Sequence, residues 1–371
     1  MSKLNWKSIV GWGIAALVAG FIVYTNMQEQ KALQESGKRN VYAVLPLTGT
    51  MAATGKEIKK TMEIYMQANP SMPFEVKFYD NESDPNKTIS IARQIAINDE
   101  NPLFTCSVSG LCRPLIPILS SLNGFLLLSP SPRAETEDWK EFQRISFSHL
   151  DTNQPFIDFV RPDQTVVIIH SNDETGHSGA NLIAENLQKK GITVLKKVAF
   201  DHKELDNRIT VLKAMSYNPD VIIVTAGPSM GFVKVIKTLK EQEYPGLILS
   251  DPSLRTPSLI ALFSEKESEG VYVPVMPIAR IQQEYPEVEK TLTAAGLELY
   301  NFTINTWDTM NIIKHFVSNN IPFNQDEFRK LGKWHGISGD IIFSDKGNSN
   351  YHFIMSVIKN GQFIPVESED K

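Results

Sequence analysis

The chain has 371 residues, of which 42% are hydrophobic and 21% are charged, and its formal net charge at pH 7 is -5. A chain of this length and composition can bury a large core, and its size predicts about two domains. Because the charge is slightly negative and lysines cluster only in pairs, the sequence argues against nucleic acid as a partner; the pairs are Lys59-Lys60, Lys189-Lys190 and Lys196-Lys197.

The amino-terminal segment is predicted to be a membrane anchor or a signal peptide. Residues 9–25 are uncharged and largely apolar, and Lys3 and Lys7 precede them. That length is at the short end of a membrane span of about 17–25 residues and exceeds the usual signal-peptide core of about 7–15. We predict that residues 1–25 form a single-pass anchor, or alternatively a cleaved signal that leaves a soluble periplasmic protein. Residues 26–39 are predicted to form a stalk, and the two lysines place the body outside the cytoplasm.

Residues 40–149 predict successive units of strand, polar loop and helix. The first strand, 41–45, runs into Pro46-Leu47-Thr48-Gly49, and apolar residues then recur at helical spacing over 57–67. In open α/β sheets, loops at the carboxyl ends of strands bind small molecules. Four such units in a row predict a parallel sheet covered by helices. Further strands are expected at 74–79, 103–106 and 124–128, and further helices from Pro85, capped by Asp84, and over 113–122, bent by Pro117.

A second series of the same units is predicted from about residue 156. It ends in a strand, 270–275, that is suited to return between two lobes. The carboxyl-terminal part predicts helices and then a β-hairpin with an Asn-Gly turn. Strands are expected at 165–170, 194–200, 220–224, 246–250, 339–343, 351–359 and 362–366, and helices at 178–190, 205–215, 231–241, 285–295, 302–319 and 325–333.

The chemistry-bearing residues predict neither an enzyme nor a metal site. Cys106 and Cys112 lie six residues apart, so a disulfide between them is possible in an oxidising compartment. The two cysteines and seven histidines show no zinc-type spacing, and no cofactor is predicted. Gly176 does not follow a strand as a nucleophile elbow would, and Gly55 lacks the Lys-Ser/Thr of a phosphate-binding loop.

In their order and spacing, these segments resemble the type I periplasmic binding proteins, and within them the Leu/Ile/Val-binding group. The resemblance covers residues 41–366. It implies an α/β fold of two doubly wound, Rossmann-like lobes joined by three crossover segments, which close on a ligand like a Venus flytrap. Lobe 1 is predicted as 40–149 plus 275–345, and lobe 2 as 150–274 plus 346–371. The most specific markers are Pro46-Leu47-Thr48-Gly49 with Gly55, the turn from Asp80 to Asp84-Pro85, residues 124–131, and residues 338–347 with Asn360-Gly361.

The resemblance also implies a ligand site at the strand ends. In amino-acid binders of this group, a serine after the third strand and a small residue and a threonine after the fourth hold the ligand carboxylate and amino group. Two aromatic residues and one acidic residue of the second lobe complete the site. The corresponding positions here are Ser109 or Gly110, then Ser131 and Arg133, then Thr175 and Gly227 at the aromatic positions, and Asp251 at the acidic one; Thr48 and Ser107 lie beside them.

The substitutions at these positions leave two interpretations of each residue. Arg133 offers a fork that suits a carboxylate, or it is a surface arginine paired with Glu135. The serines bind ligand or satisfy backbone groups in turns, and Asp251 pairs with an ammonium group or initiates a turn.

The predicted function is therefore that of an extracytoplasmic solute receptor. It closes on a small polar ligand, an amino acid or a related carboxylate or amide, and delivers it to the subunits of an ABC-type permease. The alternative is a bilobed interaction protein that regulates another protein of the cell envelope.

Overall fold

The computed structural model describes residues 38–129, 139–201 and 206–366. The predicted anchor, residues 1–25, lies outside these ranges, as do most of the predicted stalk and the predicted site residues Ser131 and Arg133. Within the described ranges, no helix combines the length and the apolar character that crossing a bilayer requires.

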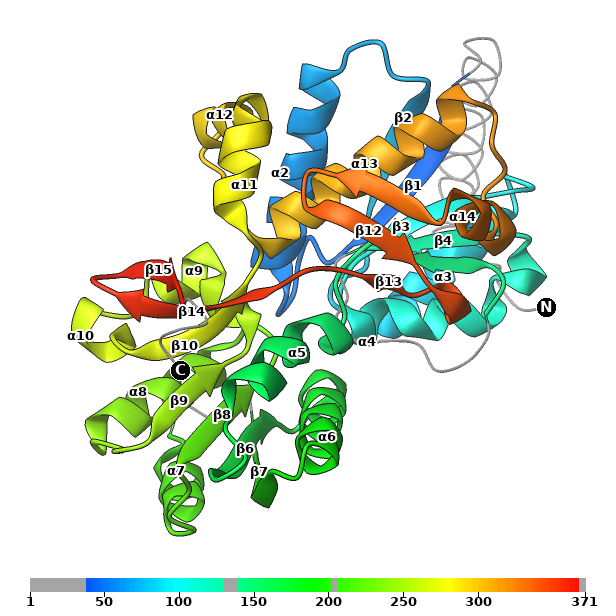
Figure 1. Cartoon of the computed structure of the whole chain (residues 1–371). Coiled ribbons are helices and arrows are strands. Elements are labelled where there is room, and N and C mark those ends of the chain that lie inside the picture. Colours follow the sequence, from blue (N-terminus) through cyan, green and yellow to red (C-terminus); the bar gives the residue numbers. More distant parts are fainter. Residues whose placement is uncertain (1–37, 130–138, 202–205, 367–371) are drawn as a thin grey trace, which may run out of the picture.

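The first part of the chain builds a five-stranded sheet (Figure 1). Its strand order is β2-β1-β3-β4-β5, and all neighbouring strands run parallel. A parallel sheet places the carboxyl ends of its strands at one edge, so the polar loops that follow these strands share that edge. The strands are β1 (Arg39–Leu45), β2 (Phe74–Asp80), β3 (Leu103–Cys106), β4 (Phe125–Leu128) and β5 (Phe142–Arg144).

Helices cover both faces of this sheet. Because side chains alternate along a strand, neighbouring residues of β1 enter two different apolar cores. We call this sheet and its helices the first lobe. One core contains Val41, Ala43 and Leu45 and lies against α2 (Ala52–Ala68), α12 (Pro286–Ala294) and α13 (Asn301–Ser318); the other contains Tyr42 and Val44 and lies against α3 (Pro85–Ala96).

The middle of the chain builds a seven-stranded sheet of order β15-β14-β10-β9-β8-β6-β7, which we call, with its helices, the second lobe. Its strands from β6 to β10 run parallel, whereas β14 and β15 join its edge antiparallel. The strands are β6 (Thr165–Ser171), β7 (Thr193–Phe200), β8 (Val221–Thr225), β9 (Leu247–Ser250), β10 (Val271–Val275), β14 (Ile354–Lys359) and β15 (Gln362–Pro365), and the main helices are α5 (His149–Phe159), α6 (Glu174–Lys189), α7 (Arg208–Met215) and α8 (Met230–Glu241).

The chain passes between the two sheets three times, after β5, after β10 and between β13 and β14 (Figure 1). These passages agree with the three crossovers that the resemblance implies, and the exact lobe boundaries stay a prediction. The remaining elements are a small sheet of β11 (Lys333–Gly336), β12 (Gly339–Phe343) and β13 (Ser349–Asn350), and the helices α9 (Pro257–Ile260), α10 (Glu265–Ser268), α11 (Ile278–Glu284) and α14 (Gln325–Leu331).

Three predicted helices are wrong at their starts, and two of these differences concern the site. Helix α2 begins at Ala52 rather than 57. The helix predicted over 113–122 is a short helix, α4 (Ser109–Cys112), followed by two 3-10 helices, because Pro114 and Pro117 cannot donate backbone hydrogen bonds. Helix α6 begins at Glu174 rather than 178, because Asp173 caps it by accepting a hydrogen bond from Gly176 N at 2.8 Å. Thr175 therefore lies in the first turn of a helix and not in a loop.

The capping prediction for α3 is confirmed. Asp84 precedes the helix and accepts a hydrogen bond from Asn86 N at 2.8 Å, and Pro85 takes the first helical position. Asn360 and Gly361 both have positive φ, at 50° and 73°, as the predicted hairpin turn between β14 and β15 requires. Seven elements were not predicted, namely β5, α5, α9, α10, α11, β11 and β13.

Candidate functional site: the facing strand ends of two lobes

Asp80, the last residue of β2, organises the loop that follows β1. Its carboxylate accepts hydrogen bonds from Leu47 N at 2.9 Å, from Thr48 N at 3.1 Å and from Thr48 Oγ1 at 2.7 Å. Desolvation raises the pKa of Asp80, but these hydrogen bonds and one from Glu82 N outweigh it and hold the pKa below its usual value. Thr48 is thus fixed at the strand-end edge of the first lobe, with its residue surface exposed.

The loop after β3 is closed by a disulfide. Cys106 ends β3 and Cys112 ends α4, and the two are joined with a Cα–Cα distance of 5.9 Å. Between them, Val108 has φ 71°, a conformation that is costly for a β-branched side chain. The predicted site residues Ser107, Ser109 and Gly110 all lie within this loop, so the disulfide holds a strained loop where ligand is expected.

Two serine hydroxyls lie at the ends of neighbouring strands of the first lobe. Ser107 follows β3 and Ser129 follows β4, and Ser129 N donates to Cys106 O at 3.0 Å. The residues are 0% and 2% exposed, and neither Oγ has a hydrogen-bond partner in the part of the chain that the structure describes. Since buried polar groups are normally paired, these two hydroxyls at one strand-end edge are candidates for hydrogen bonds to a ligand.

The corresponding edge of the second lobe carries Thr225, at the end of β8, and Asp251, directly after β9. Thr225 Oγ1 donates to Asp251 Oδ2 at 3.3 Å, and Ser253 donates to Asp251 Oδ1 through both its N and its Oγ, at 2.9 and 2.7 Å. Asp251 thus does initiate a turn, as one interpretation holds. Among the residues that the structure describes, its Oδ2 accepts one long hydrogen bond, and burial raises the pKa of this carboxyl to about 6.

At the two positions where the resemblance implies aromatic residues, this chain has the small residues Thr175 and Gly227. A Cβ atom added to Gly227, in the loop between β8 and α8, would meet nothing within 4 Å. Thr175 is half-buried in the first turn of α6. A ligand held here would therefore meet a smaller wall in the second lobe than the family pattern provides.

An ion pair joins the two edges. Arg113, directly after α4, lies with its Nη1 2.7 Å from Oε1 of Glu174, the first residue of α6. Both side chains are partly shielded from solvent, at 21% and 35% exposure. Because α4 follows a strand end of the first lobe and α6 follows one of the second, this pair brings the two edges face to face.

Neither this pair nor Ser129 was singled out from the sequence. Arg113 and Glu174 are 61 residues apart, and no local pattern connects them. Ser129 could have been found, because it occupies the same place after β4 as Ser107 does after β3. The predicted residues Thr48, Ser107, Ser109, Gly110, Thr175, Gly227 and Asp251 all lie at or just after the carboxyl ends of strands, and their binding role stays a prediction.

Removing the disulfide is expected to lower the stability of the first lobe. In Cys106→Ser combined with Cys112→Ser, the free energy of unfolding should fall by about 2 kcal/mol, because a disulfide across a short loop restricts the unfolded chain. Urea denaturation measures the change. Dithiothreitol should lower the stability of the wild type by a similar amount and leave the double variant unaffected; equal stability of the wild type and the double variant would contradict the prediction.

Breaking the ion pair between the lobes is expected to weaken ligand binding. Glu174→Gln should make the closed form less stable relative to the open form by about 1 kcal/mol, since the pair is partly exposed. The Kd for the ligand should then rise roughly fivefold. Calorimetric titration gives the Kd, and small-angle X-ray scattering of the ligand-free protein should show a larger radius of gyration. Glu284→Gln is the matched control, because it breaks the pair with Arg280 within one helix and should change neither quantity.

Comparison with known proteins agrees with this architecture. Residues 41–317 match the profile of a family described as periplasmic binding protein. The Leu/Ile/Val-binding protein homolog 3 of Brucella melitensis is 22% identical over 283 residues, which are 73% of this chain and 76% of that protein.

Two solved structures show the same fold at low sequence identity. The branched-chain amino acid transporter substrate binding protein of Streptococcus pneumoniae, in complex with isoleucine, is 13% identical with a TM-score of 0.75, and the match covers 89% of this chain and 99% of that one. A solute binding protein of an ABC transporter from Rhodopseudomonas palustris, in complex with benzoate, is 15% identical with a TM-score of 0.74, covering 89% and 96%. The chain belongs to the periplasmic binding protein family, type I, and within it is similar to the Leu/Ile/Val-binding group.

Proposed function

We propose that this protein is an extracytoplasmic receptor whose lobes close on a small carboxylate, an amino acid or a related acid or amide, and deliver it to an ABC-type permease. The observation that carries the proposal is the pair of buried hydroxyls of Ser107 and Ser129, which have no partner among the described residues. A carboxylate oxygen can accept a hydrogen bond from each of them. The relatives with isoleucine and with benzoate share a carboxylate group in their ligands, which supports this choice of chemistry.

In the second lobe, Asp251 supports a ligand that also carries an amino group. Asp251 is a buried carboxylate at the facing edge, and it is suited to an ammonium partner. The space beside Gly227 favours a ligand with a broader body than a compact aliphatic side chain. In this proposal the permease binds the closed form of the receptor. A ligand therefore promotes delivery by binding the closed form more tightly than the open form.

A thermal-shift screen against amino acids, simple carboxylates and amides tests the proposal. At least one carboxylate should raise the melting temperature, because a ligand that binds only the folded state stabilises it by mass action. Ser107→Ala and Ser129→Ala should each weaken that ligand about tenfold, since each removes a hydrogen bond to a charged group. Thr238→Ala, a buried threonine on α8, should leave ligand affinity unchanged. If no compound moves the melting curve, the receptor function is wrong.

The pH dependence of binding should identify the role of Asp251. Burial raises its pKa to about 6, so the carboxylate is charged above that pH. The affinity for an amino acid should then fall about tenfold for each pH unit below 6, because only the ionised form pairs with the ammonium group. The affinity for a carboxylate without an amine should not fall in this way. In Asp251→Asn, the affinity for the amino acid should no longer depend on pH in this range. If the affinity of the wild type is also unchanged between pH 5 and pH 7, Asp251 does not pair with the ammonium group.

The second candidate function is regulation of another protein of the cell envelope. It is favoured by one observation, the absence of aromatic side chains at Thr175 and Gly227, where the resemblance expects them. Its signature would be co-purification of an envelope protein together with no response to any compound in the screen. For location, we propose a membrane anchor in residues 1–25 with the body in the periplasm. A mature protein whose amino terminus lies beyond Thr25 would instead be the soluble periplasmic form.

A further inference from the structure

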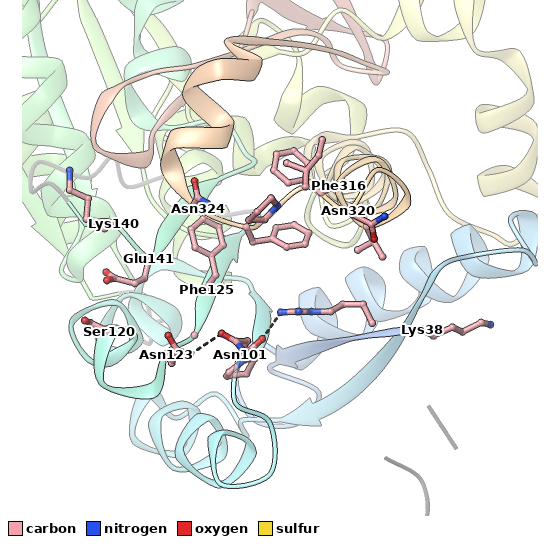
Figure 2. Close-up of a pocket in the computed structure, with 17 residues that line it drawn as sticks. Lys38, Asn101, Ser120, Asn123, Phe125, Lys140, Glu141, Phe316, Asn320 and Asn324 are labelled. Atoms are coloured by element: carbon pink, nitrogen blue, oxygen red, sulfur yellow. Dashed lines mark hydrogen bonds between the residues drawn. The ribbon is translucent and has the colours of Figure 1, made fainter. Parts of the chain in front are cut away.

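The first lobe has a hollow at the opposite edge of its sheet from the candidate site. It is a cavity of about 740 Å³, within the range of about 300–1,000 Å³ that is usual for small-molecule sites. Its walls come from the amino ends of strands and from the link between α13 and α14 (Figure 2). The strand residues involved are Arg39 of β1, Pro102 before β3, Gly124 and Phe125 at β4, and Glu141 before β5.

The inner wall of this hollow is aromatic. Phe125, Phe316 and Phe323 line it, with ring centroids of Phe316 and Phe323 5.1 Å apart and those of Phe125 and Phe323 6.3 Å apart. In Figure 2 the side chains of Phe125 and Phe316 lie in the interior of the pocket, whereas the asparagines lie around its rim. Phe316 is 1% exposed and Phe125 is 7% exposed, so these rings are fixed by core packing. Phe323, which is half-buried, packs against both of them and offers a rigid apolar surface to a flat group.

Arg39 supplies a cation with unused hydrogen-bonding capacity. One terminal nitrogen of its guanidinium donates to the backbone oxygen of Asn101, which is a neutral partner. The Nε atom is buried and has no hydrogen-bond partner among the residues described. Asn123, which donates to Asn101 Oδ1 at 2.8 Å, holds this side of the rim in place (Figure 2). Arg39 as a whole is only half-buried, and a guanidinium is suited to a carboxylate or phosphate group.

The charge of the lining favours an anion. Among the described residues that line the hollow, Lys38, Arg39 and Lys140 are cationic and Glu141 alone is acidic. An excess of positive charge in a concave, partly apolar surface concentrates negatively charged ligands. The aromatic wall and the cation together define one class of ligand, an anion attached to a flat apolar body.

We propose that this hollow is a second ligand site, separate from the cleft between the lobes, that binds a small amphipathic anion with a planar apolar body. Arg39 binds the anionic group, and the ring of Phe323, held by Phe125 and Phe316 behind it, contacts the body. The site uses no residue of the cleft, since Ser107, Ser129 and Thr48 lie at the other ends of the same strands. It therefore does not depend on the proposed transport function.

Calorimetric titration of the full chain with 2-naphthoate tests this site. We expect saturable binding, and Arg39→Gln should weaken it at least about tenfold by removing the charge-assisted hydrogen bonds. Lys140→Glu, at an exposed position, should weaken it several-fold by charge reversal and decides the question if Arg39→Gln does not fold. The uncharged analogue 2-naphthalenemethanol should bind at least about tenfold more weakly.

Ser107→Ala separates this site from the cleft. It should leave the affinity for 2-naphthoate within about twofold, because the two sites share no side chain. The inference is overturned by any of four results: no saturable binding at millimolar concentration, wild-type affinity in the folded Arg39→Gln or Lys140→Glu variants, equal affinity for the uncharged analogue, or loss of binding in Ser107→Ala alone. The last result would assign 2-naphthoate to the cleft and would support the proposed function instead.

Discussion

Gly55→Val is expected to lower the free energy of unfolding by about 3 kcal/mol, which is the upper end of the usual cost of overpacking. Helix α2 approaches the turn after β1 so closely that a Cβ atom on Gly55 would lie 2.1 Å from the backbone oxygen of Pro46 and 2.6 Å from its carbonyl carbon. Backbone atoms cannot move aside as a flexible side chain can, so the helix and the turn must separate. Urea denaturation followed by circular dichroism measures the loss.

Gly110→Ala is the matched control for this prediction. A Cβ atom on Gly110, which also lies in a helix, would meet nothing within 4 Å, so the free energy of unfolding should change by less than about 1 kcal/mol. Gly176→Val should repeat the large effect in the second lobe, because a Cβ atom there would lie 2.2 Å from the backbone oxygen of Ser171. Wild-type stability of Gly55→Val would mean that α2 does not pack on the turn at this distance.

Asp308→Ala is expected to destabilise the protein by about 3 kcal/mol or more, because it leaves several buried donors without an acceptor. Asp308 lies in α13 and is 0% exposed. Its carboxylate accepts hydrogen bonds from Ile337 N at 2.7 Å, from Ser338 N at 3.1 Å and from Ser338 Oγ at 2.5 Å. These bonds fix the turn between β11 and β12 on the helix. Thermal and urea denaturation measure the loss.

Two variants show whether the acceptor itself is responsible. Ser338→Ala removes one donor and leaves both backbone bonds, so its cost should be about 1 kcal/mol. Asp326→Ala removes an exposed carboxylate paired with Arg329 and should leave stability unchanged within error. If Asp308→Ala were no more destabilising than Ser338→Ala, the carboxylate would not be what holds the turn.

Much of the fold could be predicted from local patterns. The apolar runs of β1, β3 and β8 and the helical spacing in α3 and α8 are properties of short windows of sequence, and the structure places these elements within a few residues of the prediction. Asp84 caps the helix start two residues away with its side chain, Pro85 takes the first helical position, and Asn360 and Gly361 form a turn through their own positive φ. The family match over residues 41–317 confirms the resemblance that these segments indicated together.

The local predictions were least accurate where a single residue sets where a helix begins or which type of helix forms. Asp173 starts α6 early and moves Thr175 from a loop into a helix. Pro117 lies inside a 3-10 helix instead of bending an α-helix. Short elements such as β5 and β11 were missed, because three or four residues carry too little periodicity to distinguish a strand from a loop.

Local sequence patterns are enough to indicate the family, the two series of strands and helices, and the edge at which a ligand is expected, because each depends on residues that are near one another in the chain. The tertiary structure decided which of those residues meet: Arg113 with Glu174, Gly55 with Pro46, and Asp308 with the turn at Ser338. It also decided that the hydroxyls of Ser107 and Ser129 are buried without a partner. Whether a polar group is satisfied depends on every atom around it, and those atoms come from distant parts of the chain.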